Sequence, residues 1–233
     1  MKNLSEYWKK EFNTIKNGTE NDWEISKWSH QGFLARYKAV ENYINSIRDK
    51  LISPIIVDIG SGPGIYSKIF ADIDAKIISL DFSQEVLKDG VNKKYFSMPI
   101  TADAIQTPLR NSSVDIVVCV GVLQHIEPFE NLIIEARRIL KNNGKLILIS
   151  RNALYYKDLY LYQGYIRSFF PFALKDYFSS IGIITKIIEP IFINKSYSFL
   201  AGLINALFRI RLFSFIILLF ARAFMIIGEK YRE

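Results

Sequence analysis

The chain has 233 residues, is 50% hydrophobic and carries a formal net charge of +7. This length fits one domain with a small appendage, and the apolar content supplies a large core, which excludes a mainly disordered chain. The single cysteine, Cys119, excludes an internal disulfide and a cysteine-based zinc cluster. The basic balance favours an anionic neighbour (nucleic acid, a membrane surface or a charged substrate), although the basic residues are scattered rather than clustered.

The sequence predicts no secretory signal at its start, because residues 1–21 are polar and aromatic. We therefore expect the protein to stay in the cytoplasm. Residues 199–227 are apolar except for five side chains, which are Asn205, Arg209, Arg211, Ser214 and Arg222. The charge-free stretch 212–221 is only about half of the roughly 20 residues that a spanning helix needs, so a transmembrane helix is not predicted.

Residues 1–50 are expected to form an N-terminal helical cap, because apolar side chains recur at spacings of one, three and four from Phe33 to Ile47. Short apolar strands then alternate with helices. The predicted strands cover residues 55–59, 76–80, 98–102, 114–120 and 145–150. The predicted helices cover residues 65–72, 83–91 and 129–140, with Ser83 capping the second and Gly144 stopping the third.

Strands separated by helices in this way predict an α/β fold with a parallel sheet and right-handed crossovers. Ligands of such sheets bind beyond the carboxyl ends of the strands, near the point where the strand order reverses. That rule places four features around one crevice: residues 60–64, Asp81, Asp103 and residues 121–125.

The central motif is VDIGSGPG at residues 57–64, directly after a buried strand. Glycines there let the backbone approach a ligand closely, as in dinucleotide-binding folds. In the dinucleotide fingerprint, however, the third small residue would fall on the bulky Ile65, and Pro63 removes an N–H that a pyrophosphate would need. Asp58 adds negative charge, so the loop suits a positively charged nucleoside better than a dinucleotide.

Two further acids follow the next two predicted strands. Asp81 can accept hydrogen bonds from both ribose hydroxyls, since an ionised carboxylate has two acceptor oxygens. Asp103 can accept from the exocyclic amine of an adenine. Three acids at three successive strand ends are a more specific signal than the glycines alone.

At these residues the chain resembles the class I S-adenosylmethionine-dependent methyltransferases, of the small-molecule type related to quinone and sugar methyltransferases. The resemblance covers roughly residues 30–150. Its matching pieces are VDIGSGPG at 57–64, SLDFS at 79–83, ADAIQTPLRNSSVDIVVCVGVLQHI at 102–126 and EARRILKNNGKLILI at 135–149. It implies a Rossmann-like doubly wound seven-stranded sheet whose last strand is antiparallel, with S-adenosyl-L-methionine as the cofactor.

The resemblance also implies roles for individual residues. The glycine loop would surround the methionine and ribose through Gly60, Ser61, Gly62 and Gly64. Asp81 would accept from the ribose hydroxyls, Phe82 would pack on the adenine, and Asp103 and Ala104 would contact the base. The methyl-transfer pocket would be lined by Val120 to Leu123. For Asp58, two interpretations remain open: contact with the ligand, or orientation of the loop through backbone N–H groups. Arg36 either meets the methionine carboxylate or is a surface cation, and Trp28, His30 or Tyr37 could also close the site.

His125 is the candidate catalytic base, because it sits at the right strand end; the alternative is a structural role. Some quinone O-methyltransferases carry Glu-x-x-Glu-His there to bind a divalent metal, but Gly121 and Gln124 occupy the two acidic places, so no metal is expected. Nucleic acid is not an expected substrate either, since the strand end lacks the (Asp/Asn)-Pro-Pro-aromatic motif and Cys119 lies in an apolar strand, where a thiol is inert.

The resemblance divides the chain into a cap at 1–50, a methyltransferase core at 51–193, an apolar helical insertion at 194–221 and the final strand at 222–233. It predicts a helix at 174–181, strand six at 183–192 and strand seven at 223–231. The insertion is either a helical lid over the pocket or against a second subunit, or an interfacial helix pair on the inner face of a membrane, joined there by the aromatic stretch 152–172.

The predicted function is methyl transfer to a small or lipid-linked acceptor, most readily at oxygen: a quinone or isoprenoid precursor, a surface-glycan sugar or a secondary metabolite. The alternatives are a non-catalytic membrane-associated protein that retains the cofactor fold and a nicotinamide-dependent oxidoreductase. Outside the site, Asp115 is expected to serve folding, and Glu135, Arg137 and Arg138 are expected on the solvated face of a helix.

Overall fold

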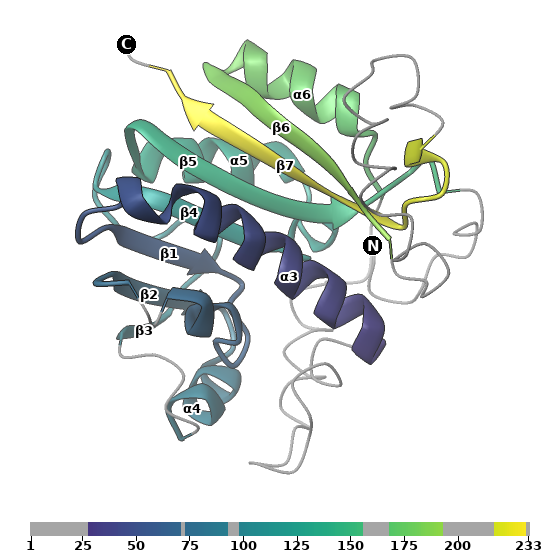
Figure 1. The fold of residues 1–233 in the computed structure, drawn as a ribbon. Helices are drawn as coiled ribbons and strands as arrows, with labels where there is room; N and C mark the ends of the chain where they lie inside the picture. Colours follow the sequence, from purple (N-terminus) through teal and green to yellow (C-terminus); the bar gives the residue numbers. More distant parts are fainter. Residues whose placement is uncertain (1–27, 71–72, 93–97, 156–167, 193–216, 232–233) are drawn as a thin grey trace.

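A computed structural model of the chain describes residues 28–70, 73–92, 98–155, 168–192 and 217–231. Its centre is a seven-stranded sheet in the order β3-β2-β1-β4-β5-β7-β6 (Figure 1). The strands are β1 (Ile55–Ile59), β2 (Lys76–Asp81), β3 (Met98–Thr101), β4 (Val114–Val120), β5 (Leu140–Arg151), β6 (Ile183–Ile191) and β7 (Ala223–Lys230). The first five pair in parallel, and β7 runs antiparallel to both of its neighbours, which confirms the predicted fold class.

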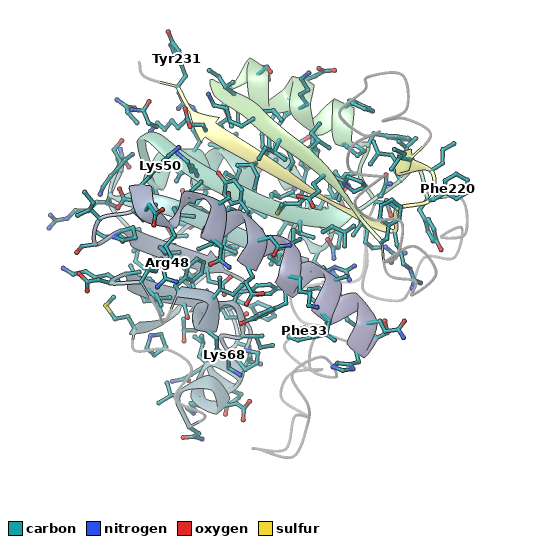
Figure 2. All side chains as sticks on the ribbon, in the orientation of Figure 1. Phe33, Arg48, Lys50, Lys68, Phe220 and Tyr231 are labelled. Atoms are coloured by element: carbon teal, nitrogen blue, oxygen red, sulfur yellow. The ribbon has the colours of Figure 1, made fainter. Side chains whose placement is uncertain are left out.

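Helices cover both faces of the sheet (Figure 1). The α-helices are α3 (His30–Ile47), α4 (Gln84–Asn92), α5 (Phe129–Ile139) and α6 (Pro171–Ser180), and the 3-10 helices are η1 (Arg48–Lys50), η2 (Tyr66–Phe70) and η3 (Leu123–His125). Helix α3 crosses one face, from the end that carries Phe33 to the end that leads into Arg48 and Lys50 (Figure 2). The Ser29 hydroxyl caps its start by accepting a hydrogen bond from Gly32 N at 3.1 Å.

Strand β1 divides its side chains between two hydrophobic clusters. Ile56 packs with Val40 and Ile44 of α3, whereas Val57 and Ile59 belong to the cluster that includes α5 and α6. Because side chains alternate along a strand, Asp58 is directed to the same face as Ile56, beneath α3. A carboxylate is thereby placed in the layer between the helical cap and the sheet.

Several predicted elements agree closely with the structure. The bounds of β1 and β4 are as predicted, and the Ser83 hydroxyl does cap α4, accepting from Val86 N at 3.4 Å. The helix predicted at 65–72 is a shorter 3-10 helix, η2. These agreements fix the strand ends around which the candidate site is built.

Gly144 does not stop a helix, so that prediction is wrong. Strand β5 begins at Leu140, directly after α5, and the strand pairing shifts register between Val114 and Ile116. A Cβ at Gly144 would lie 2.8 Å from the Lys141 carbonyl oxygen and 3.2 Å from that of Asp115. The glycine therefore allows a close approach of backbone inside the sheet.

Two predicted units fall largely outside the described residues. The predicted cap at 1–50 is described only from Trp28 onward, and the predicted insertion at 194–221 only from Ile217 onward. The aromatic stretch at 152–172 is described at its two ends. Within the described part of the chain, no helix is long and apolar enough to cross a membrane.

Candidate functional site

The glycine loop after β1 adopts a left-handed backbone at three positions. Gly60, Gly62 and Gly64 have φ angles of +67°, +55° and +86°, a region that favours glycine. A Cβ at Gly60 would overlap the side chain of Val122, whereas at Gly62 the nearest atom would be a Val86 methyl carbon at 3.9 Å. The loop is thus packed against the end of β4 at Gly60 and has room at Gly62.

Asp81 joins this loop to the end of β2. Its Oδ2 accepts from Gly62 N at 3.0 Å, and its Oδ1 accepts from Ser83 N at 2.9 Å. Burial raises the pKa of Asp81 to about 6, although the backbone hydrogen bonds from Ser83, Gly62 and Phe82 oppose that shift. Because a carboxylate has about four lone-pair positions and three backbone donors are present, Asp81 retains capacity to accept from a ligand.

Asp58 is a buried carboxylate without a complete set of partners. It is 1% exposed, and its Oδ2 has no hydrogen-bond partner among the described residues. Burial, reinforced by the nearby charge of Asp81, raises its pKa well above the usual range. Such a group stabilises a cation placed next to it, because the cation offsets the cost of burying the negative charge.

Arg36 is buried rather than a surface cation, so that alternative is wrong. It is 7% exposed, and its Nη1 donates to the Gly32 carbonyl at 2.7 Å. Its guanidinium carbon lies 4.5 Å from the centroid of the Trp28 ring, within cation–π range. Helix α3 therefore supplies a positive charge to the same layer that holds Asp58.

Tyr66 is a site residue that the sequence did not predict. Its ring stacks on Tyr37 of α3 at a centroid distance of 6.1 Å, and its buried hydroxyl has no hydrogen-bond partner among the described residues. Burial is the main reason that the pKa of Tyr66 is raised; the charge of Arg36 lowers this pKa and that of Asp58 raises it. Tyr66, Arg36 and Asp58 therefore share one electrostatic environment. The signal available in the sequence was its place two residues after Gly64.

The end of β4 meets the N-terminal end of α3. Gly121 has a φ angle of +73°, and the Trp28 ring occupies the position that a Cβ would take. Gln124 is buried there, with its Oε1 accepting from the Ser150 hydroxyl at 3.2 Å. The cap thus lies directly on the strand end where the sequence predicted a methyl-transfer pocket.

The other predicted residues of this strand end differ in exposure. Val120 and Leu123 are buried, and Leu123 lies in the hydrophobic cluster with α5 and α6, so a ligand at this place would meet its backbone. His125 is half-buried at the end of η3, with its backbone N–H donating to the Val122 carbonyl at 2.8 Å.

Phe82, Asp103 and Ala104 lie at the ends of β2 and β3. Ala102 N donates to the Asp81 carbonyl at 3.0 Å, which brings the two strand ends together. Phe82 and Ala104 are half-buried, whereas Asp103 is exposed and accepts from Ile105 N at 3.1 Å. The structure therefore gathers the predicted acids along one edge of the sheet.

The expectations for residues outside the site had mixed outcomes. Asp115 serves folding as predicted, since it accepts from Ile55 N at 2.9 Å and pairs with Lys141 at 2.8 Å. Glu135 is not on a solvated face: it is buried, accepts from the Thr107 N–H and hydroxyl at 2.6 Å each, and pairs with Arg138 at 2.7 Å. The reason is that the loop before β4 folds back over α5.

Two chemical alternatives can be judged from the geometry. Burial raises the pKa of the Cys119 thiol to about 12, which makes it inert as predicted. Among the described residues, no group of three or more His, Cys, Asp or Glu side chains could hold a metal ion.

Comparison with known proteins finds similarity to methyltransferases in the part of the chain that holds the glycine loop. Residues 57–148 match the family model described as a methyltransferase domain. An uncharacterised protein of Methanocaldococcus jannaschii is 30% identical over 137 residues, which cover 54% of this chain and 58% of that protein. The ubiquinone biosynthesis O-methyltransferase of Proteus mirabilis is 26% identical over 121 residues, 48% of each chain. The chain thus spans about half the length of the curated relatives it matches.

The fold comparison extends over nearly the whole chain. The structure of the magnesium protoporphyrin IX methyltransferase of Synechocystis with bound S-adenosylmethionine has a TM-score of 0.67 and covers 99% of this chain and 98% of that one. At 14% sequence identity, this likeness shows the fold alone. Residues 57–148 thus match a methyltransferase-domain model, and the chain as a whole has the same fold as the Synechocystis methyltransferase.

Proposed function

We propose that the protein transfers a methyl group from S-adenosylmethionine to a small or lipid-linked acceptor. The observation that carries this proposal is the buried Asp58 carboxylate, whose Oδ2 has no partner among the described residues, beside a loop with room at Gly62. These groups fit a cationic nucleoside. When bound, S-adenosylmethionine supplies an electrophilic methyl group on a sulfonium, which is displaced in line by the acceptor.

The amino-acid end of the cofactor fits between the cap and the sheet. There Asp58 receives the ammonium group, and Arg36 binds the carboxylate as a charge-assisted donor. The Tyr66 hydroxyl, buried and unpaired among the described residues, is the second donor to that carboxylate. One buried layer thus holds one acid, one cation and one hydroxyl for a zwitterion.

The nucleoside end lies along the strand ends of β2 and β3. Asp81 accepts from the ribose hydroxyls through the lone pairs that Gly62 N and Ser83 N leave unused. Gly60, Ser61 and Gly64 shape the loop around the ribose and methionine chain. Phe82 and Ala104 pack on the adenine, and exposed Asp103 accepts from its exocyclic amine.

The acceptor occupies the end of β4, bounded by Val120, Gly121 and the backbone of Leu123. Positioning accounts for much of the rate of such a displacement, because the two reacting groups are held at attack distance. His125, half-buried at this strand end, takes the proton that a hydroxyl acceptor loses. If it acts as a base, His125→Ala lowers kcat for a hydroxyl acceptor while the Kd for S-adenosylmethionine is unchanged; equal kcat values would assign it a structural role.

Oxygen is the proposed acceptor atom. The ubiquinone biosynthesis O-methyltransferase of Proteus mirabilis supports this choice at the level of a 26% identical relative. A quinone or isoprenoid precursor is therefore the first acceptor class to assay, followed by glycan sugars and secondary metabolites. No comparison supports the alternative of a non-catalytic protein with this fold.

A membrane-presented acceptor is supported by three exposed phenylalanines. Phe170, Phe172 and Phe220 are 55%, 39% and 43% exposed. Asn152 contacts both segments that carry these phenylalanines. It forms an isolated β-bridge with Phe169, and its Nδ2 donates to the carbonyls of Leu218 and Ala221. Figure 2 shows Phe220 at the far side of the molecule from Lys50.

Liposome sedimentation tests this part of the proposal. We expect wild type to bind vesicles of phosphatidylcholine with phosphatidylglycerol, and the triple variant Phe170→Ser/Phe172→Ser/Phe220→Ser to remain in the supernatant. A matched control changes Ile52, Met98 and Ile134, which are exposed elsewhere, to serine. Absence of wild-type binding would exclude the membrane, and equal loss in the control would exclude this surface.

The first test of the function itself is calorimetric titration with S-adenosylmethionine and, separately, with NADH. Micromolar binding of the first ligand alone supports the proposal. Binding of NADH alone, or of neither ligand, contradicts it.

A further inference from the structure

Trp28 contacts two parts of the candidate site at once. One edge of its ring lies where a Cβ of Gly121 would be, and its face carries the Arg36 guanidinium at 4.5 Å from the ring centroid. Because Gly121 directly follows β4 and Arg36 lies on α3, Trp28 bridges the acceptor end of the sheet and the cap.

The Arg36 side chain is held on two sides by these contacts. Its Nη1 donates backward to Gly32, four residues earlier on the same helix, and the indole covers another side of the group. The positive charge of Arg36 lowers the pKa of Tyr66, although burial has the larger effect and raises it. A long cationic side chain has many rotamers, and burial in one of them has an entropic cost that the stacking ring offsets.

We infer that Trp28, seated on Gly121, is a positioning residue that holds the Arg36 guanidinium toward the carboxylate of the cofactor. This inference rests on the proposed function, because it takes Arg36 as the carboxylate ligand. It assigns to Trp28 no contact with the methyl group or the acceptor. The affinity for the amino-acid tail of S-adenosylmethionine then depends on the Trp28 ring, which lies at the acceptor end of β4.

The test compares two ligands that differ in the amino-acid tail, whose carboxylate is the group that Arg36 is proposed to bind. S-adenosylhomocysteine has the carboxylate and ammonium groups, and 5′-methylthioadenosine lacks both. In calorimetry or competition binding, Trp28→Leu is expected to raise the Kd for S-adenosylhomocysteine about 3- to 30-fold. The Kd for 5′-methylthioadenosine is expected to stay unchanged, since its binding does not use Arg36.

A double-mutant cycle identifies the partner through which Trp28 acts. Arg36→Met is expected to weaken S-adenosylhomocysteine with the same selectivity, and adding Trp28→Leu to it should bring little further loss. Trp28→Phe retains an aromatic face and is expected to restore most of the affinity. It also serves as the second variant should Trp28→Leu fold poorly.

Phe33 provides the control, because it is a buried aromatic residue near Trp28 in the chain, at the end of α3 seen in Figure 2, and its ring packs against Tyr37 at a centroid distance of 6.0 Å. Phe33→Leu is expected to leave the ratio of the two Kd values unchanged. The inference fails if Trp28→Leu weakens both ligands equally, or if its effect adds fully to that of Arg36→Met. The proposed function fails separately if wild type binds neither S-adenosylmethionine nor S-adenosylhomocysteine.

Discussion

The backbone N–H of Gly62 donates to Oδ2 of Asp81 at 3.0 Å, so the middle of the glycine loop is tied to the end of the neighbouring strand. The other carboxylate oxygen accepts from Ser83 N, at the start of α4. One side chain thereby fixes two backbone segments around the proposed ribose position. Its substitution should affect both the loop and the ligand.

Replacing Asp81 with asparagine should weaken S-adenosylmethionine binding by roughly 10- to 100-fold, because hydrogen bonds to a charged group are lost. Wild-type affinity should also fall as the pH decreases through about 6, where the Asp81 carboxylate becomes protonated. The variant should lack this pH dependence. Calorimetry between pH 5 and 8 measures both effects, and an unchanged affinity would place the ribose elsewhere.

Replacing Asp58 with asparagine should stabilise the ligand-free protein by about 1–3 kcal/mol at neutral pH, since the variant avoids the cost of burying a carboxyl group that is ionised in the unfolded chain. The folded-state pKa is raised above 3.8, so the protonated form is the stabilising one. The advantage of the variant should therefore be absent below pH 3.8 and grow as the pH rises through the folded-state pKa. Urea unfolding at several pH values measures it, and the same variant should bind S-adenosylmethionine more weakly.

Alanine at two glycines of the loop should separate folding from binding. Gly60→Ala should lower the free energy of unfolding by more than about 2 kcal/mol, because a left-handed backbone and an overlap with Val122 are both imposed. Gly62→Ala should cost only about 1 kcal/mol, since its Cβ has room, but its added methyl group should reduce cofactor affinity. If Gly60→Ala and Gly62→Ala lost cofactor affinity in the same proportion to their losses in free energy of unfolding, this assignment would be contradicted.

Glu135→Gln tests the polar cluster behind the sheet. The hydrogen bonds from Thr107 and Arg138 lower the pKa of Glu135 against the effect of burial, so its ionised form stabilises the fold. That stabilisation is present above the usual pKa of 4.5 and is lost as the pH falls through the lower folded-state value. The variant should lose about 1.5–3 kcal/mol at neutral pH, with an unchanged Kd for S-adenosylmethionine. A change in that Kd would show that the cluster reaches the site.

Local sequence patterns predicted the strands well, for physical reasons. The continuous β-branched runs of β1 and β4 can be buried on both faces only in a parallel sheet, so their bounds were predictable. The error at Gly144 arose because a glycine after an amphipathic run looks like a helix stop, whereas here a close approach to the Asp115 backbone requires it. That approach depends on pairing between strands, which local patterns do not contain.

The site was predictable to the extent that its residues lie in one motif. Asp58, Gly62 and Asp81 follow from strand ends and a glycine loop. Two other features depend on how α3 lies across the sheet: the contact of the Trp28 ring with Gly121, and the buried Tyr66 hydroxyl that has no hydrogen-bond partner among the described residues. Such contacts join segments far apart in the sequence, and no periodicity specifies them.

The pairing of β6 with β7 has a consequence for how this protein can be altered. Ile191 and Ala223 are direct partners in the antiparallel ladder, so the chain leaves the sheet and returns to it at neighbouring points. The entropic cost of closing such a loop grows only slowly with its length. The chain between Ile191 and Ala223 can therefore change in length at little cost to the sheet, with the glycine loop and its acids left in place.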